Sequence, residues 1–367
     1  MNLKIKEFKT ILSSTNTSYK FLLFYSLIKI LKTDPRITEI TYKQLLKNIL
    51  KFAWFPCFQF ALKFREQDRI KPVLEQLTKS VNLDLKIKQP NNKLIKKIEE
   101  EIDALLSIRE NYVAVESLLL KYVLDRLVRP FYPSLKNAPE SGENSILKKK
   151  IEILRNKEEF IKNKPIYFNF EKEKKIILDK DWRDYIILHY DFLELWVISE
   201  WENYMKLYNP SVENLRFKLK IPEISREALT KSRNFWEKII YNEKIKCIFS
   251  KQILNKNNYH IDHYICWNFL AHDNEWNLLP ILSSENLDKS NKIPKQIFLK
   301  DFVELKALSL SSNLSSITKN FDIYTDSHIN FVGQPLYDLD HFKKIYEKKM
   351  LGLTNSAILN GFQYWNK

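Results

Sequence analysis

The densest group of side chains that could bind a metal ion or move a proton lies in residues 259–294. His260, Asp262 and His263 stand within four positions of one another, and Asn277 and Asn286 follow. Hydrolysis of a phosphodiester needs a base that takes a proton from water and a positive charge that stabilises the transition state. Histidine supplies such a base near neutral pH, and carboxylate and amide oxygens bind divalent cations. These residue types therefore indicate metal-dependent phosphodiester hydrolysis.

The order of these residues is more informative than their presence. Three segments follow one another: Asp262-His263-Tyr-Ile, then Trp276-Asn277-Leu-Leu-Pro280, then Asn286-Leu-Asp-Lys289-Ser-Asn291-Lys-Ile-Pro294. Together they resemble the signature of HNH nucleases, also called ββα-metal nucleases. The resemblance is especially close to the HNH domain of CRISPR-guided DNA nucleases, which has Asp-His on the first strand and Asn on the helix.

The resemblance implies a role for each motif residue. Asp262 and Asn286 would bind the metal ion, and His263 would be the general base that activates water. Asn277 would orient the loop that carries the histidine. Lys289, one helical turn after Asn286, would face phosphate.

Other polar residues of the stretch have less direct roles. His260 shares a strand face with Asp262, and we expect it and Asn291 beside the site without contact with the metal. The hard oxygen ligands favour Mg²⁺ or Mn²⁺ over zinc. No structural zinc is expected, because Ser250 stands where the second cysteine of a zinc-binding pair with Cys247 would be.

A ββα unit must position these side chains. Hydrophobic patterning predicts strands over residues 246–253 and 259–265, and a helix over residues 286–292. Neighbouring residues of a strand point to opposite faces, so Asp262 and His263 serve one site only if the strand ends or twists there. We therefore expect a loop that begins near Tyr264.

The remainder of the chain has mainly helical patterning. Helices are expected over residues 18–32, 41–52, 92–108, 112–128, 146–161 and 182–208, a hairpin over 166–170 and 175–178, and a loop over 133–145. The predicted class is α+β, mainly helical, with a small ββα-metal module. The predicted divisions are a basic helical accessory domain (1–164), a hairpin and long helix as linking region (165–230), the HNH module (231–300) and a helical C-terminal segment (301–367).

Composition excludes several other classes. The 367 residues include only four glycines, and no two are spaced as in a phosphate-binding loop, so no nucleotide cofactor is expected. Three cysteines without a CxxC pair exclude a disulfide framework and favour a reducing compartment. The most apolar run, residues 21–28, is far shorter than the roughly 20 residues of a membrane-spanning helix. We therefore expect a cytoplasmic protein without membrane contact.

The positive charge is concentrated away from the motif. The formal net charge is +15, and residues 1–70 hold 13 basic and five acidic side chains. Clustered cations displace counterions from nucleic acid, so we expect Lys43, Lys47 and Lys51, together with Lys292, to contact DNA. The alternative is compositional, because Lys, Asn and Ile are abundant throughout, as an AT-rich genome would produce. The charge alone does not separate these interpretations.

The sequence thus predicts a metal-dependent HNH endonuclease that hydrolyses DNA. Proteins of this kind with a long helical N-terminal region occur in bacterial phage-defence or mobile-element settings, which is the expected context. The alternative is a catalytically silent nucleic-acid-binding or assembly subunit of a defence complex. A third interpretation is a nuclease that is silent until a regulatory or sensor protein releases it.

Overall fold

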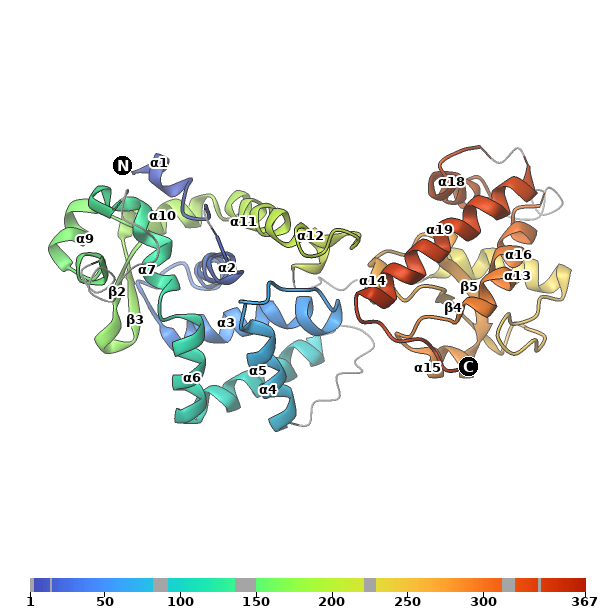
Figure 1. Ribbon diagram of the computed structural model, residues 1–367, viewed down its shortest axis with the longest axis horizontal. Helices are drawn as coiled ribbons and strands as arrows, with labels where there is room; N and C mark the ends of the chain where they lie inside the picture. The colour runs from blue at the N-terminus through green and yellow to red at the C-terminus, as the bar shows by residue number, and fades with distance from the viewer. Residues whose placement is uncertain are drawn as a thin grey trace. The chain divides into compact units, whose positions relative to one another are not determined.

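The computed structural model describes residues 3–13, 15–81, 92–135, 150–220, 229–311, 321–335 and 338–367. Contacts between Cα atoms divide the chain into two compact units, drawn in Figure 1. Unit 1 comprises residues 1–85, 90–210 and 215–222, and unit 2 comprises residues 86–89, 211–214 and 223–367.

Unit 1 is mainly helical. Its helices are α1 (Ile5–Phe8), α2 (Tyr19–Thr33), α3 (Tyr42–Trp54), α4 (Ile70–Val81), α5 (Asn92–Ser107), α6 (Arg109–Leu119), α7 (Val123–Val128), α9 (Lys157–Asn163), α10 (Lys180–Leu188), α11 (Tyr190–Lys206) and α12 (Leu215–Lys218). Short turns of other helix types are η1 (Phe55–Gln59), η2 (Arg129–Phe131), η3 (Pro133–Leu135) and η4 (Glu171–Glu173). Helix α2 is apolar nearly all round and contacts α3, α7, α10 and α11, so it forms the centre of this unit.

A three-stranded antiparallel sheet completes unit 1. The predicted hairpin is confirmed as β2 (Tyr167–Phe170) and β3 (Lys175–Leu178). A third strand, β1 (Glu39–Thr41), pairs with β3 on its other side, which the sequence did not predict. Because β1 has only three residues and leads directly into α3, it shows no alternating pattern of its own. Thr41 and Gln44 form a capping box that begins α3.

Two predicted helices are interrupted. The helix expected over residues 182–208 is α10 followed by α11, with His189 outside helical geometry, and the one over 112–128 is α6 followed by α7. Buried Ile186, Leu193 and Val197 continue the same apolar period across the first break, so periodicity alone does not reveal it. The loop predicted over 133–145 falls largely on residues 136–149, outside the described part of the chain. The helix predicted over 146–161 is helical at residues 150–154, is interrupted at residues 155 and 156, and continues as α9.

Unit 2 is built around a two-stranded sheet. Its elements are α13 (Thr230–Glu243), β4 (Tyr259–His263), α14 (Trp267–Leu270), η5 (Glu275–Asn277), β5 (Leu278–Leu282), α15 (Ser283–Lys289), η6 (Gln296–Phe298), α16 (Leu299–Ser309), α18 (Phe321–Val332) and α19 (Leu339–Leu359). Strands β4 and β5 are antiparallel, with Tyr259 opposite Leu282 and His263 opposite Leu278. Figure 1 shows α13, α16 and α19 around this sheet.

The prediction that residues 246–253 form the first strand of the ββα unit is wrong. Residues 246–253 form a turn closed by a single bridge between Lys246 and Ile253, and the real partner of β4 is β5. All five residues of β5 are buried, so its sequence Leu-Leu-Pro-Ile-Leu shows no alternation that would mark it as a strand. The predicted helix over 286–292 begins three residues earlier and ends at Lys289.

The mainly helical α+β class predicted from the sequence is confirmed. One apolar core extends through unit 2 and includes Trp236, Ile281, Phe302, Tyr346 and Trp365, so the C-terminal helices pack against the sheet. All three cysteines are buried and unpaired with one another. In the described part of the chain, no helix is both long and apolar enough to cross a membrane.

Candidate active site

Strand β4 ends at His263, and a bend follows at Tyr264, as the sequence predicts. Asp262 is partly exposed, whereas His263 is only 3% exposed. Because successive residues of β4 point to opposite faces, His263 turns toward the interior and Asp262 toward the side where α15 packs. The strand end thus brings a carboxylate and an imidazole to the same edge of the sheet.

Lys289 joins these two residues from α15. Its ammonium donates to Oδ2 of Asp262 at 2.9 Å and to the carbonyl oxygen of His263 at 2.7 Å, and the side chain is fully buried. The structure therefore gives Lys289 protein partners where the sequence predicts a phosphate contact. The reason is geometric: one helical turn after Asn286, the side chain points inward onto β4.

The other motif residue of α15 faces His260. Nδ2 of Asn286 donates to Nδ1 of His260 at 3.3 Å. An amide that donates through its nitrogen presents its oxygen elsewhere, and the oxygen is the atom that binds a cation. Asn286 and Lys289 therefore lie side by side along β4, next to His260 and Asp262 respectively.

Asn277 clamps the loop that follows His263. Its Oδ1 accepts from the backbone N–H of Ile265 at 2.9 Å, and its Nδ2 donates to the carbonyl of the same residue at 2.8 Å. The carbonyl of Asn277 also accepts from the N–H of Tyr264 at 2.8 Å. The Asn277 side chain is fully buried, so these bonds are shielded from water and fix the loop next to the histidine.

The C-terminal helices hold the turn that carries Asn277. Lys306 of α16 donates to the carbonyl of Glu275 at 2.7 Å and to the carbonyl of Leu278. Tyr346 of α19 donates to the carbonyl of Trp276. With the bond from Tyr264 to Asn277, every carbonyl of residues 275–278 has a partner. Helices α16 and α19 therefore help to build the site from residues outside the motif.

The ammonium group of Lys306 is buried near the rings of Trp236, Phe302 and Tyr324. Burial lowers its pKa to about 7, and the carboxylate of Glu275 opposes that change. Burial raises the pKa of Glu275, whose Oε1 accepts from Ser232 at 2.5 Å. Burial also lowers the pKa of His328 well below its usual range. A set of titratable groups thus lies behind the turn that carries Asn277.

Asp273 is the site residue that sequence reasoning missed. Asp273 belongs to the segment that joins α14 to η5, and its Oδ1 lies 2.8 Å from Nε2 of His263. An ionised carboxylate only accepts hydrogen bonds, so Nε2 carries the proton and Nδ1 is the basic nitrogen of the ring. The available signal was a carboxylate ten residues after His263, in a short polar interval between apolar segments.

Cys247 lies in the turn that precedes β4. Its Sγ donates to Oε2 of Glu285 at 2.7 Å, and both side chains are buried. Lys367 forms an ion pair with the same carboxylate. The turn at residues 247–251 is closed by a bond from the N–H of Lys251 to the carbonyl of Cys247. Hydrogen bonding therefore ties this turn to α15.

The four lysines expected to bind DNA have protein partners in the structure. Lys47 forms an ion pair with Asp103 at 2.5 Å and Lys51 with Glu99 at 2.9 Å, while Lys43 donates to Ser107 at 3.5 Å. These partners lie on α5, which packs against α3. Lys292 donates to the carbonyl of Asp288 at 3.2 Å, and Asn291 lies half-buried in the turn after α15. The free basic stripe that the expectation assumed on α3 is therefore largely neutralised.

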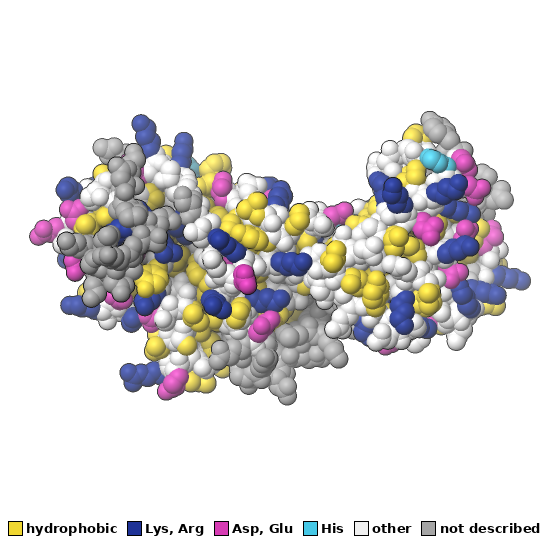
Figure 2. Space-filling view, viewed as in Figure 1, with side chains coloured by type: hydrophobic (Ala, Val, Ile, Leu, Met, Phe, Trp, Pro, Cys, Tyr) yellow, Lys and Arg dark blue, Asp and Glu magenta, His cyan; other side chains and the backbone are white. Residues whose placement is uncertain are grey.

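Charged side chains are dispersed over the face of the molecule drawn in Figure 2. Figure 2 shows Lys and Arg side chains scattered over this face, with acidic side chains between them. In the described residues, no group of three or more His, Cys, Asp or Glu side chains is arranged to hold a metal ion.

A comparison with known protein families matches the segment that carries these residues. Residues 244–295 match the family model of HNH endonuclease. No curated protein and no solved structure gives a significant match to the chain. The matched segment contains β4, η5, β5 and α15, which carry Asp262, His263, Asn277 and Asn286. Residues 244–295 therefore match an HNH endonuclease domain, which supports nuclease activity on nucleic acid and confirms the general HNH resemblance drawn from the motifs, without showing a subgroup.

Proposed function

We propose that the protein is a metal-dependent endonuclease that hydrolyses DNA, with His263 as the general base. The observation that carries this proposal is the contact between Nε2 of His263 and Asp273, at the end of the strand that also presents Asp262. This contact selects the tautomer in which Nδ1 accepts a proton. The HNH family match supplies the reaction class.

The residues present fit a hard divalent cation. Asp262 offers a carboxylate and Asn286 an amide oxygen, the ligand types that Mg²⁺ and Mn²⁺ prefer, and Mg²⁺ commonly keeps several waters beside one or two protein ligands. The hydrogen bond from Asn286 to His260 uses the amide nitrogen, so Oδ1 is the amide atom that could bind the cation. When bound, such a cation would stabilise the negative charge that develops on the scissile phosphate.

The protein residues then have distinct tasks. Nδ1 of His263 takes a proton from the attacking water, and Asp273 stabilises the imidazolium that results. Asn277 keeps the loop at Tyr264 and Ile265 in place, so the imidazole does not drift from its position. Lys289 holds the carboxylate of Asp262 in one orientation.

The alternative is a catalytically silent nucleic-acid-binding or assembly subunit of a defence complex. The proposal of activity is favoured over it because His263 has an orienting carboxylate, which a site without chemistry would not need. The proposed setting is bacterial defence against phage, with a protein partner as a regulator.

A plasmid-cleavage assay tests the proposal. Wild-type protein is incubated with supercoiled plasmid and Mg²⁺ or Mn²⁺, with EDTA as the metal-free control. We expect nicked or linear plasmid only with metal, and we expect Asp262→Asn to need more metal for the same rate. Asp301→Asn is the matched control, because Asp301 forms an exposed ion pair with Lys251. Plasmid binding without cleavage under every metal condition would favour the silent subunit.

A further inference from the structure

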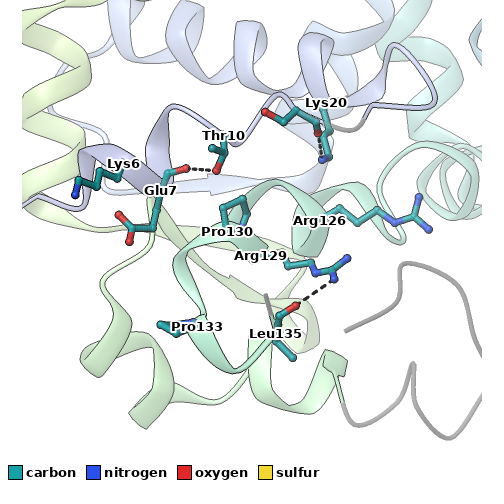
Figure 3. Close-up of a pocket in the computed structure, with 10 residues that line it drawn as sticks. Lys6, Glu7, Thr10, Lys20, Arg126, Arg129, Pro130, Pro133 and Leu135 are labelled. Atoms are coloured by element: carbon teal, nitrogen blue, oxygen red, sulfur yellow. Dashed lines mark hydrogen bonds between the residues drawn. The ribbon is translucent and has the colours of Figure 1, made fainter. Parts of the chain in front are cut away.

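Unit 1 has a pocket that takes no part in the proposed chemistry. Figure 3 shows the residues around it, which belong to α1, α7 and their neighbouring segments and include Glu7, Arg126 and Pro130. Its lining mixes basic, acidic, polar and apolar side chains, so it does not select one class of ligand. The feature that extends the proposed function lies in unit 2, at residues 362–367.

Residues 362–367, called the strap below, pass beside the chain just after α15. The backbone N–H of Ile293 donates to the carbonyl of Gln363 at 2.9 Å, and the N–H of Trp365 donates to the carbonyl of Ile293 at 2.7 Å. These bonds belong to a parallel bridge between Ile293 and Tyr364. Figure 1 shows the label C, which marks this part of the chain, beside α15. The strap is therefore joined to the segment that leaves α15.

Two side chains of the strap also bond to α15 itself. Nε1 of Trp365 donates to Oδ2 of Asp288 at 2.8 Å, and Lys367 forms an ion pair with Glu285. Glu285 and Asp288 are three positions apart, so they lie on one side of the helix. Glu285 has a second partner in Cys247, whereas among the described residues Trp365 is the one partner of the Asp288 carboxylate.

Other side chains of α15 hold the helix to strand β4. Asn286 bonds to His260 and Lys289 bonds to Asp262, so these two helix residues lie together on the side that faces the strand. Each directly follows one of the carboxylates that bond to the strap. Successive residues of a helix are turned by about 100° around its axis, so β4 and the strap hold α15 from two directions. Together they fix the rotation of the helix and the direction of the Asn286 amide.

Helix α15 depends on such contacts because it is short. It has seven residues, and its N-cap residue Leu282 makes no side-chain capping bond. A helix of this length is not stable without tertiary contacts. The strap is itself anchored in the core, since Trp365 is only 1% exposed and meets the ring of Phe249 edge-on, with centroids 4.9 Å apart.

We propose that Trp365 is a positioning residue of the proposed metal site, which acts through Asp288 and α15 to hold the Asn286 amide where its oxygen can bind the cation. This inference rests on the proposed function for the role of Asn286. Groups that orient a metal ligand typically contribute about 10- to 100-fold to metal affinity. Because Trp365 acts through the helix and does not touch Asn286, the lower value, about tenfold, is expected.

The test uses Trp365→Phe, which keeps an aromatic ring in the core and removes the N–H that bonds to Asp288. Binding of Mn²⁺ to the full chain is measured without DNA, from the loss of the paramagnetic resonance signal of free Mn²⁺. Asp262→Asn gives the background from any other sites. We expect the Kd for Mn²⁺ to rise about tenfold in Trp365→Phe. Hydrogen exchange in EDTA should also become faster over residues 283–292.

Phe298→Leu is the matched control. Phe298 meets the ring of Phe249 edge-on at 5.1 Å, as Trp365 does, but its side chain has no group that can hydrogen-bond to α15. The control should lower the Tm and leave the Kd for Mn²⁺ unchanged. An equal rise of the Kd in Phe298→Leu would overturn the proposal, because general loosening of the core would then explain the effect. An unchanged Kd in Trp365→Phe would overturn it as well.

A double-mutant cycle tests whether Trp365 acts through Asp288. Asp288→Ala removes the same bond from the other side, so the variant with both changes should bind Mn²⁺ no more weakly than the weaker single variant. Fully additive losses would contradict this route.

Failure of this inference and failure of the proposed function give different results. Plasmid cleavage by the wild-type protein, with an unchanged Kd in Trp365→Phe, overturns the positioning role alone. A tenfold rise in the Kd, with no cleavage by the wild-type protein, supports the positioning role and counts against the proposed nuclease. Wild-type protein that binds no Mn²⁺ above the Asp262→Asn background would overturn the positioning role.

Discussion

Replacing Asp273 by Asn should slow cleavage without loss of the fold. The change keeps the shape of the side chain but removes the charge that faces Nε2 of His263 at 2.8 Å. Once His263 has taken a proton from water, the resulting imidazolium would be stabilised by a carboxylate and much less by a neutral amide. The variant therefore acts on the transition state and hardly on DNA binding.

The magnitude follows from the type of bond. A hydrogen bond that involves a charged group contributes about 1.5–3 kcal/mol, and each 1.4 kcal/mol changes a rate about tenfold. His263 is 3% exposed, so water cannot replace the lost partner efficiently. We expect kcat to fall by about 10- to 150-fold in Asp273→Asn, with KM within about twofold of the wild-type value.

Single-turnover nicking of supercoiled plasmid at saturating metal measures this effect. Asp301→Asn serves as the control, because its ion pair with Lys251 is exposed and contributes little. A wild-type rate in Asp273→Asn would refute the role of the carboxylate. A rise in KM with kcat unchanged would also refute it, since that result would place Asp273 in substrate binding.

Three other substitutions probe the framework of the site. Asn277→Ala leaves the buried N–H and C=O of Ile265 without their partner, so urea unfolding should show a loss of about 2–5 kcal/mol; a loss below about 1 kcal/mol would contradict the clamp. Lys289→Met should cost about 3 kcal/mol in the same assay, because Asp262 loses its buried partner, and an unchanged stability would contradict the pair. Lys306 has a pKa of about 7 when folded and about 10.4 when unfolded, so the unfolded chain binds the extra proton and stability should rise between pH 7 and 9; Lys306→Met should lose this rise, and equal slopes would contradict it.

The sequence predicted the strand end at His263 and the bend after it better than it predicted strand β5. Asp262 and His263 lie at the end of β4, and a bend follows at Tyr264. This strand end could be predicted because the alternation of a half-buried strand is visible in the sequence up to that point. Strand β5 was missed because all of its residues are buried, and a continuous apolar run has no period.

Contacts between segments that are distant in the sequence could not be predicted from it. Asp273 meets His263 only because α14 folds the chain back, and Lys306 reaches the turn at Asn277 only because α16 packs behind it. No local pattern encodes either contact. The ion pairs that neutralise Lys47 and Lys51 likewise depend on where α5 lies against α3. Net charge counted along the chain therefore does not show which lysines of unit 1 have acidic partners.

The central claim is that His263 performs the proton transfer in DNA cleavage. The most direct measurement compares plasmid nicking by wild-type protein, His263→Ala and His341→Ala under the same Mn²⁺ or Mg²⁺ concentration, with circular dichroism to verify folding. His341 is an exposed residue of α19 and is the control. We predict that His263→Ala loses nicking by at least about 100-fold while His341→Ala keeps the wild-type rate. Retained cleavage by folded His263→Ala would contradict the mechanism proposed for this site.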